Sequence, residues 1–495
     1  MLFNSLEFII FFPIVLLVYF VIPKKARYLW LLGASYFFYM SWNAAYALLL
    51  LASTAMTYVA GRFLEIFKED EKRRKQIVFV NLFLNFGILF LFKYINFAIE
   101  TVIALLGKAH IEVAPISFDF LLPVGISFYI FQAVGYTMDV YRGKVSAEKN
   151  FFRYALFVSF FPQLVAGPIE RSGNLLNQLR ECHNIKLWNP KRIQQGALVM
   201  LYGYVLKMIL ADRMAIYVDQ VFDPVQYGNY QGFTVLFGIV LFTLQIYCDF
   251  SGYTFIAIGA AKVMGFDLMN NFKAPYYAVS IKDFWDRWHI SLSTWFRDYL
   301  YFPLGGSRKG NVRKYLNIMI VFTLSGLWHG AAWHYVLWGV MHGVMRVFGE
   351  VTEKMRKKAY NAMQIQTEVF SFQLFRGIFT FICVAVAWTF FRASSVSQGL
   401  ALLKNGFCHY NPWVLFDGSL HEILSAKDWN VLFAGLLLLV LVDVQRYLGK
   451  DLQTAFTKQN LAFRWLVFYA GILAVVVFGI YGPGFDAAQF IYFQF

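Results

Sequence analysis

Long apolar runs recur through this chain of 495 residues and constrain its fold more than any other feature. A helix needs about 20 apolar residues to cross the roughly 30 Å hydrocarbon core of a bilayer. Backbone polar groups in that core must be satisfied within the segment, so each run is expected to be helical. The runs lie near 6–22, 28–42, 44–60, 77–98, 120–140, 152–167, 194–211, 232–264, 372–391, 431–445 and 465–481. The sequence therefore predicts an all-α polytopic membrane protein with roughly eleven crossings.

Basic loops between these runs predict the topology. The first run has no basic region before it and no small-residue cleavage site after it, so we expect a membrane helix there and no signal peptide. Lys24, Lys25 and Arg27 follow it, which places the N-terminus outside by the positive-inside rule. Parity along the chain places the tail outside too. We therefore expect a membrane-embedded domain over 1–481 and an extracytoplasmic aromatic tail over 482–495.

The composition excludes other classes of protein. With 59% hydrophobic and 20% aromatic residues, the chain is too apolar for a soluble enzyme of this length. Its formal net charge of +15 could suggest nucleic-acid binding, but the lysines and arginines gather in the short loops, where the positive-inside rule accounts for them. The four cysteines are widely separated and show no zinc-ligand spacing.

Several segments depart from plain membrane helices. Proline and glycine interrupt the apolar runs at 123–125 and 166–168, which predicts segments that are broken or re-entrant. Between 280 and 314, basic residues alternate with tryptophan, phenylalanine and tyrosine. This pattern favours an amphipathic segment at the cytoplasmic interface. The alternative is an ordinary basic loop whose aromatic residues lie at the membrane interface, which would have the same composition.

Two histidines are the candidate catalytic residues. His329 lies 15 residues after Lys314, or about 22 Å of helix, which predicts a position within the membrane. A histidine at that depth is costly and points to a function. Neutral imidazole can take a proton from a hydroxyl group and return it, so we assign His329 as a general base. His289 would polarise a carbonyl group or orient the acceptor. For each, the alternative is a hydrogen-bonded structural residue.

Other histidines and polar residues carry weaker predictions. His334 and His342 do not share one helical face with His329, and no His-Glu-x-x-His motif is present, so packing or hydrogen-bonding roles are expected for them and a metal site is not. Asp249 and Ser251 interrupt the apolar run 232–264. An intramembrane aspartate is a functional candidate; its alternative is a buried carboxylate that bonds to Ser, Tyr or Arg and fixes helix packing.

A family resemblance rests on two blocks, WDRWHISLSTWFRDYLYFPLGGSR at 285–308 and LSGLWHG at 324–330. These blocks resemble the membrane-bound O-acyltransferase superfamily, in particular the bacterial branch typified by the alginate O-acetyltransferase membrane subunit. The block from Phe161 to Arg171 is also similar to that branch. The resemblance implies a ring of tilted helices around a tunnel. Residues that would line or support such a tunnel are Trp285, Trp288, Trp328, Asp249 and Ser251.

The same resemblance implies the activity and its partners. The chain would sit in a bacterial cytoplasmic membrane and pass an acetyl group to an exported polysaccharide or cell-wall polymer. Acetyl-CoA is the expected donor, with a carrier-protein thioester as the alternative, and no bound cofactor is expected. Partners would be an extracytoplasmic transferase of the SGNH hydrolase type, polysaccharide export machinery and membrane lipids. Two competing readings are a transporter or flippase and a scaffold in which His329 is dispensable.

The aromatic tail carries the last prediction. A cytoplasmic donor and an exterior acceptor require the acyl group to cross the membrane. Tyr492 lies in the apolar segment Phe490-Ile491-Tyr492-Phe493 and could carry that group if His329 acted as its base. The alternative is that the tail anchors the chain at the membrane interface.

Overall fold

The computed structural model describes residues 1–114, 116–119, 122–165 and 167–481, and within these ranges it is built from helices without a β-strand. The contacts divide the chain into two compact units. Unit 1 comprises Met1–Met200 and Ile256–Met269, and unit 2 comprises Leu201–Phe255 and the chain from Asn270 onward. Helices α10 (Pro190–Tyr204) and α12 (Phe233–Met264) contribute residues to both units.

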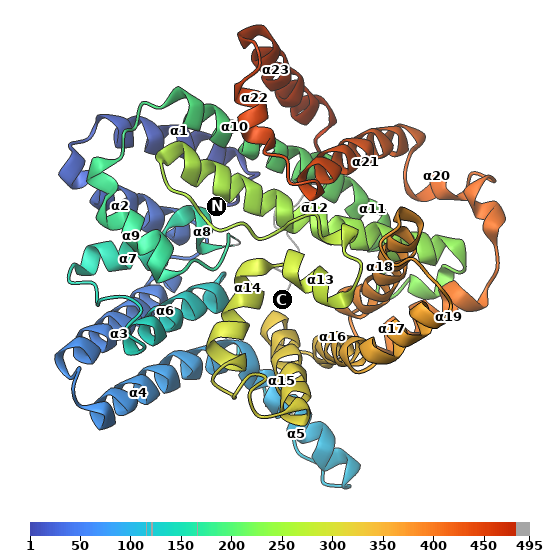
Figure 1. The fold of residues 1–495 in the computed structure, drawn as a ribbon, viewed down its shortest axis with the longest axis horizontal. Helices are drawn as coiled ribbons and strands as arrows, with labels where there is room; N and C mark the ends of the chain where they lie inside the picture. Colours follow the sequence, from blue (N-terminus) through green and yellow to red (C-terminus); the bar gives the residue numbers. More distant parts are fainter. Residues whose placement is uncertain (115, 120–121, 166, 482–495) are drawn as a thin grey trace. The chain divides into compact units, whose positions relative to one another are not determined.

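Unit 1 contains the helices of the first two hundred residues (Figure 1). They are α1 (Leu6–Val21), α2 (Arg27–Met40), α3 (Tyr46–Ile66), α4 (Glu71–Leu89), α5 (Ile95–Lys108), α6 (Ile126–Tyr141), α7 (Phe151–Ser159), α8 (Phe161–Leu164) and α9 (Asn177–Arg180). Helices α3, α4 and α6 pack against one another. Buried polar pairs join them, including Ser53 to Asn85 at 2.6 Å and Thr137 to Asn81 at 3.2 Å. Such interhelical hydrogen bonds are typical of helices that meet in an apolar environment.

The helix break predicted at 123–125 is present, since α6 begins at Ile126, whereas the break predicted at 166–168 includes Ala166, which lies outside the described residues. Gly125 has a left-handed backbone (φ 75°), and a Cβ there would approach the carbonyl oxygen of Leu164 to 2.8 Å. Helix α7 ends at Ser159, and the carbonyl of Phe157 accepts hydrogen bonds from Gln132 and Gln163 at 2.5 and 2.8 Å. Protein side chains therefore satisfy backbone groups near the break, as a buried irregular segment requires.

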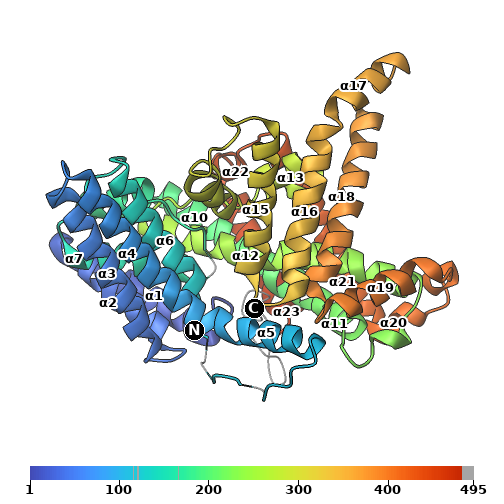
Figure 2. The ribbon, with the colours of Figure 1, turned by 90° about the horizontal axis from the view of Figure 1, so that it is seen from below.

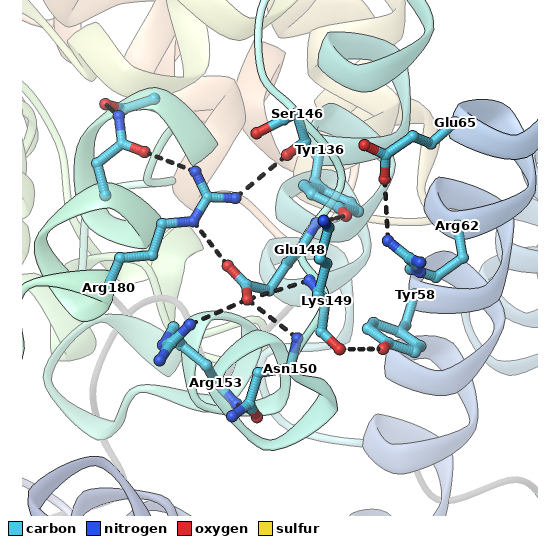
Figure 3. Close-up of polar contacts among 12 residues, drawn as sticks. Tyr58, Arg62, Glu65, Tyr136, Ser146, Glu148, Lys149, Asn150, Arg153 and Arg180 are labelled. Carbon is cyan, nitrogen blue, oxygen red and sulfur yellow. Dashed lines mark hydrogen bonds and ion pairs between the residues drawn. The ribbon is translucent and has the colours of Figure 1, made fainter. Parts of the chain in front are cut away.

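Glu148 holds the loop between α6 and α7 in place (Figure 3). Its carboxylate accepts hydrogen bonds from Arg180 at 2.7 Å, from Arg153 at 3.1 Å and from the backbone N–H of Asn150 at 3.0 Å. Burial raises the pKa of Glu148, but the Arg180 and Asn150 hydrogen bonds together with the positive charges of Arg180 and Arg153 outweigh it, and the net pKa lies below its ordinary value. The cluster joins the loop to α7 and α9 and leaves Glu148 satisfied, which indicates a structural role.

Unit 2 contains the remaining helices and both candidate histidines. They are α11 (Asp212–Val221), α13 (Ile281–Arg287), α14 (Ile290–Phe296), α15 (Asn311–His329), α16 (Trp333–Val351), α17 (Glu353–Ala362), α18 (Phe370–Arg392), α19 (Val396–Cys408), α20 (Ser419–Ile423), α21 (Ala426–Tyr447), α22 (Leu452–Thr457) and α23 (Leu461–Phe478). Figure 2 shows α15, α16 and α18 side by side, with α17 at the end of α16. The basic aromatic segment 280–314 forms short helices and turns up to Gly310, and its last residues begin α15.

Seven helical stretches among the described residues are long and apolar enough to cross a membrane. Each coincides with a run predicted from the sequence: Tyr46–Ile66, Glu71–Lys108, Pro190–Val221, Phe233–Met264, Phe370–Arg392, Ala426–Tyr447 and Leu461–Phe478. The all-helical, multi-pass class is thus confirmed. The count of roughly eleven crossings and the ring around a tunnel stay predictions.

Candidate active site

The hairpin of α15 and α16 fixes His329, the last residue of α15. Glycines bring the two backbones into contact: a Cβ at Gly326 would collide with the carbonyl oxygen of Tyr335, and one at Gly339 with that of Phe322. The Tyr335 ring fills the space that a side chain at Gly330 would need. Close packing thus explains the glycine that follows Trp328-His329, and the hairpin leaves the imidazole 3% exposed.

His289 is held in an unusual backbone conformation between α13 and α14. It is the N-cap of α14 with φ 44° and ψ 53°, a left-handed geometry that costs a residue with a side chain about 1–2 kcal/mol. Asn271 stabilises the turn, since its carbonyl accepts from Ile290 N–H at 3.0 Å and its Oδ1 accepts from Ser291 N–H at 3.1 Å. Strain of this kind gathers at functional sites because the surroundings must enforce it.

The structure brings these two histidines together although forty residues separate them. Their ring centroids lie 6.4 Å apart, and His289 is fully buried. Burial lowers the pKa of His289 to about 3, so its imidazole is neutral at physiological pH. The two buried imidazoles are therefore close neighbours in one site.

Aromatic rings enclose the histidine pair. Trp328, Trp338 and Phe391 lie 5.0, 5.1 and 5.2 Å from the ring of His329, and Phe250 lies 4.8 Å from that of His289. Apolar walls lower the local dielectric constant and strengthen every polar interaction within them. A single hydrogen bond to a reacting atom is therefore stronger in this site than it would be in water.

The tryptophans that the sequence grouped together have different surroundings. Trp285 donates its indole N–H to Nδ1 of His342 at 3.2 Å and lines a cavity. Trp288 is buried and packs on Trp388, with ring centroids 5.1 Å apart. His334 makes a hydrogen bond to the carbonyl of Phe390 at 3.0 Å. His334 and His342 thus have the hydrogen-bonding roles expected from the sequence.

Asp249 belongs to a buried ion cluster that the sequence did not reveal. Nζ of Lys207 lies 2.6 Å from Asp249 and 2.7 Å from Asp212, with all three side chains at most 4% exposed. Lys207 sits in a π-helical segment, Val205–Ala211, a geometry frequent at functional sites. The signal that could have found it is a single charged residue in the apolar run 194–211.

This cluster lies next to the histidine site along α12. Phe250, which follows Asp249, makes the ring contact to His289. Ser251 is buried beside Gly252, where a Cβ would come within 2.9 Å of the carbonyl oxygen of Gly203. The surroundings of Asp249 and Ser251 therefore resemble helix packing more than a channel wall, with lysine as the partner in place of the expected Ser, Tyr or Arg.

A cavity of about 370 Å³ in unit 2 is lined by residues close in sequence to the two histidines, although neither His289 nor His329 lines it. Ile290, the residue after His289, and Ser325, one helical turn before His329, contribute to its wall. Two arginines, Arg297 and Arg346, also contribute. The other lining residues are Trp285, Asp286, Leu292, Ser293, Thr294, Phe296, Tyr301, Ile318, Val321 and Phe322. The cavity thus combines an apolar wall, hydroxyl groups, one carboxylate and two arginines, each of which also pairs with a carboxylate: Arg297 with Asp298 at 3.1 Å and Arg346 with Glu350 at 2.5 Å.

Tyr492 lies outside the described residues, but the structure describes the chain that leads to it. The N–H of Ile480 donates to the carbonyl of Met208 at 3.0 Å, and Arg213 donates to the carbonyl of Phe478 at 2.8 Å. The segment before the tail is therefore fixed within unit 2, beside the Lys207 cluster. Among the described residues, no group of three His, Cys, Asp or Glu side chains could hold a metal ion.

Comparison with known proteins identifies the family. A probable alginate O-acetylase AlgI of Pseudomonas syringae pv. tomato is 37% identical over 397 residues, which cover 80% of this chain and 73% of that protein. A peptidoglycan O-acetyltransferase of Helicobacter pylori is 33% identical over 82% of this chain and 79% of its own. A teichoic acid D-alanyltransferase of Bacillus subtilis is 28% identical over 48% of this chain and 60% of its own. The sequence model of the membrane-bound O-acyltransferase family matches residues 37–391, and the chain belongs to this family.

Proposed function

We propose that this membrane O-acyltransferase moves an acetyl group from a cytoplasmic thioester across a bacterial cytoplasmic membrane for O-acetylation of an exported polysaccharide or cell-wall polymer. The observation that carries the proposal is the pair of buried histidines, 6.4 Å apart, beside a cavity. Relatives named for O-acetylation of alginate and of peptidoglycan support this class of substrate.

His329 acts as the general base of the transfer. Its imidazole takes the proton of the attacking hydroxyl group while the oxygen forms a bond to the thioester carbonyl carbon. When the tetrahedral intermediate collapses, the carbon–sulfur bond breaks and the leaving thiolate takes the proton from the His329 imidazolium. His289, neutral because burial lowers its pKa to about 3, orients the acceptor or donates a hydrogen bond without adding charge.

The cavity is the site that receives the donor. Arg297 and Arg346 can face the phosphate groups of acetyl-CoA, and the apolar wall suits the chain that carries the sulfur. A carrier-protein thioester shares the phosphopantetheine arm with acetyl-CoA, so both donors suit the lining. We take acetyl-CoA as the donor. Binding of CoA, measured with wild type and with Arg346→Gln, tests this choice.

On the exterior side, the acetyl group passes through Tyr492 to a partner transferase of the SGNH type that works with the polysaccharide export machinery. Tyr492 lies eleven residues beyond Tyr481, a span of up to about 36–40 Å when extended. The tail starts beside Met208, next to Lys207, and a series of short contacts through Asp249 and Phe250 leads to His289. The tail is thus long enough to bring its hydroxyl group to the histidines.

The test is polymer acetylation in cells that carry His329→Ala. We expect acetylation of the exported polymer to be lost while the protein stays at wild-type abundance in the membrane fraction. His409→Ala is the matched control, because His409 is exposed and lies outside the site. A His329→Ala protein that is present and supports wild-type acetylation would contradict the proposal and favour a transporter or a scaffold.

A further inference from the structure

Trp338 is the ring that joins His329 to the rest of the aromatic cluster. It lies on α16, and its indole is perpendicular to His329 (88°) at a centroid distance of 5.1 Å. Phe391 lies 5.1 Å away, His342 lies 5.0 Å away, and Trp388 is stacked on it at 5.3 Å. Trp338 is fully buried. Its position is therefore fixed on several sides, including the side that faces the proposed base.

The indole N–H of Trp338 has no hydrogen-bond acceptor among the residues that the structure describes. Three other indoles do find one: Trp285 donates to His342, Trp30 to the carbonyl of Val15, and Trp429 to the carbonyl of Leu420. Trp388 shares the lack of an acceptor among the described residues, but no ring contact joins it directly to His329. A buried N–H without an acceptor costs stability, and native proteins seldom keep one without a reason. The vacant donor lies on a ring that touches His329, beside the place where the acyl group reacts.

We infer that the indole N–H of Trp338 donates a hydrogen bond to the carbonyl oxygen of the acyl group during transfer. When the hydroxyl oxygen attacks the carbonyl carbon and His329 takes the proton, the carbonyl electron pair moves onto that oxygen. The negative charge then faces the indole N–H. On collapse the carbonyl re-forms and the thiolate leaves. This assignment rests on the proposed function and adds the group that stabilises the charge.

A neutral donor suits this position. A cation buried among Trp328, Trp338 and Phe391 would pay a large desolvation cost in the ground state, whereas an indole N–H costs less and needs no counter-ion. Its ring is held by packing on Trp388 and Phe391, so the donor is in place before charge develops. Preorganised donors of this kind contribute typically about 10² to 10³ in kcat.

The main test variant replaces the indole N–H and keeps the bicyclic ring. Incorporation of 3-benzothienylalanine at position 338 keeps the ring shape and puts sulfur where the N–H was, and Trp338→Phe is the encoded counterpart. With purified protein and a thioester donor, we expect kcat to fall about 10²- to 10³-fold, with KM for the donor changed less than threefold. The same isostere at Trp388 is the matched control, since Trp388 stacks on Trp338 but is one ring further from His329.

Two results would overturn the inference. One is a benzothienylalanine protein that keeps kcat within twofold of wild type. The other is an equal loss of kcat from the isostere at position 388, which would assign the effect to packing. His329→Ala separates this inference from the proposed function: if that variant is inactive while the 338 isostere is fully active, only the role of Trp338 fails. An active His329→Ala would contradict the proposed function itself.

Discussion

At the residue scale, His289 combines a chemical group with a backbone that few residues accept. Its φ of 44° lies in the left-handed region, where asparagine is tolerated much better than alanine. The strain is held by Asn271 and by the start of α14. Chemistry and backbone can therefore be separated by the choice of substitution.

We expect His289→Asn and His289→Ala to lower acyl transfer by similar factors, about 10²-fold, because each removes the imidazole. Their stabilities should differ, with the alanine variant less stable by about 1 kcal/mol since it accepts the left-handed backbone poorly. Turnover and thermal unfolding of both purified variants check this. Wild-type turnover in either variant would show that the imidazole has a structural role only.

At the scale of elements, the α15–α16 hairpin determines where His329 lies. Gly326 and Gly339 face each other with their backbones in contact, a packing that only glycine permits. The hairpin also carries Trp338 and the cavity wall at Ser325. A small separation of these two helices would move the proposed base, its neighbouring indole and the donor cavity together.

Gly339→Ala tests this arrangement. The added methyl group collides with the carbonyl of Phe322, and we expect a loss of about 1–3 kcal/mol in stability together with at least tenfold lower turnover. Gly349→Ala, on the same helix, meets nothing within 4 Å and should leave both quantities near wild type. Thermal unfolding and turnover of the two variants give the comparison. Equal behaviour of both would refute the close-packing argument.

At the scale of the whole molecule, the transfer has to join the two sides of a membrane. The sequence predicts a cytoplasmic donor side, given by the basic segment 280–314, and an exterior tail from 482 onward. The described chain ends beside Met208 and Arg213, so the tail begins in the unit that holds the histidines. A hydroxyl group on that tail is a candidate carrier between the two sides.

Tyr492→Phe separates a carrier from an anchor, because it keeps the aromatic ring and removes only the oxygen. We expect polymer acetylation to fall by at least tenfold at unchanged protein abundance. Phe493→Tyr, combined with Tyr492→Phe, tests whether a hydroxyl one residue away can substitute. Acetylation at the wild-type rate in Tyr492→Phe alone would show that the tail serves as an interfacial anchor.

The sequence by itself determined the class of this protein and predicted two of its eight histidines as candidate catalytic residues. Hydropathy is a property of each segment, so the apolar runs predicted the seven helical stretches that, among the described residues, are long and apolar enough to cross a membrane. The cost of a histidine in an apolar segment is equally local. It singled out His329, because 15 residues of helix after Lys314 predict a position within the membrane.

Only the tertiary structure decided which side chains meet. The 6.4 Å spacing of His289 and His329, the Lys207 partner of Asp249 and the vacant N–H of Trp338 depend on how separate helices pack. Such contacts join residues 9 to 42 positions apart and are set by backbone approach at glycines and by aromatic shape. The pattern of apolar residues does not predict those distances, because many packings of the helices bury the same apolar surface.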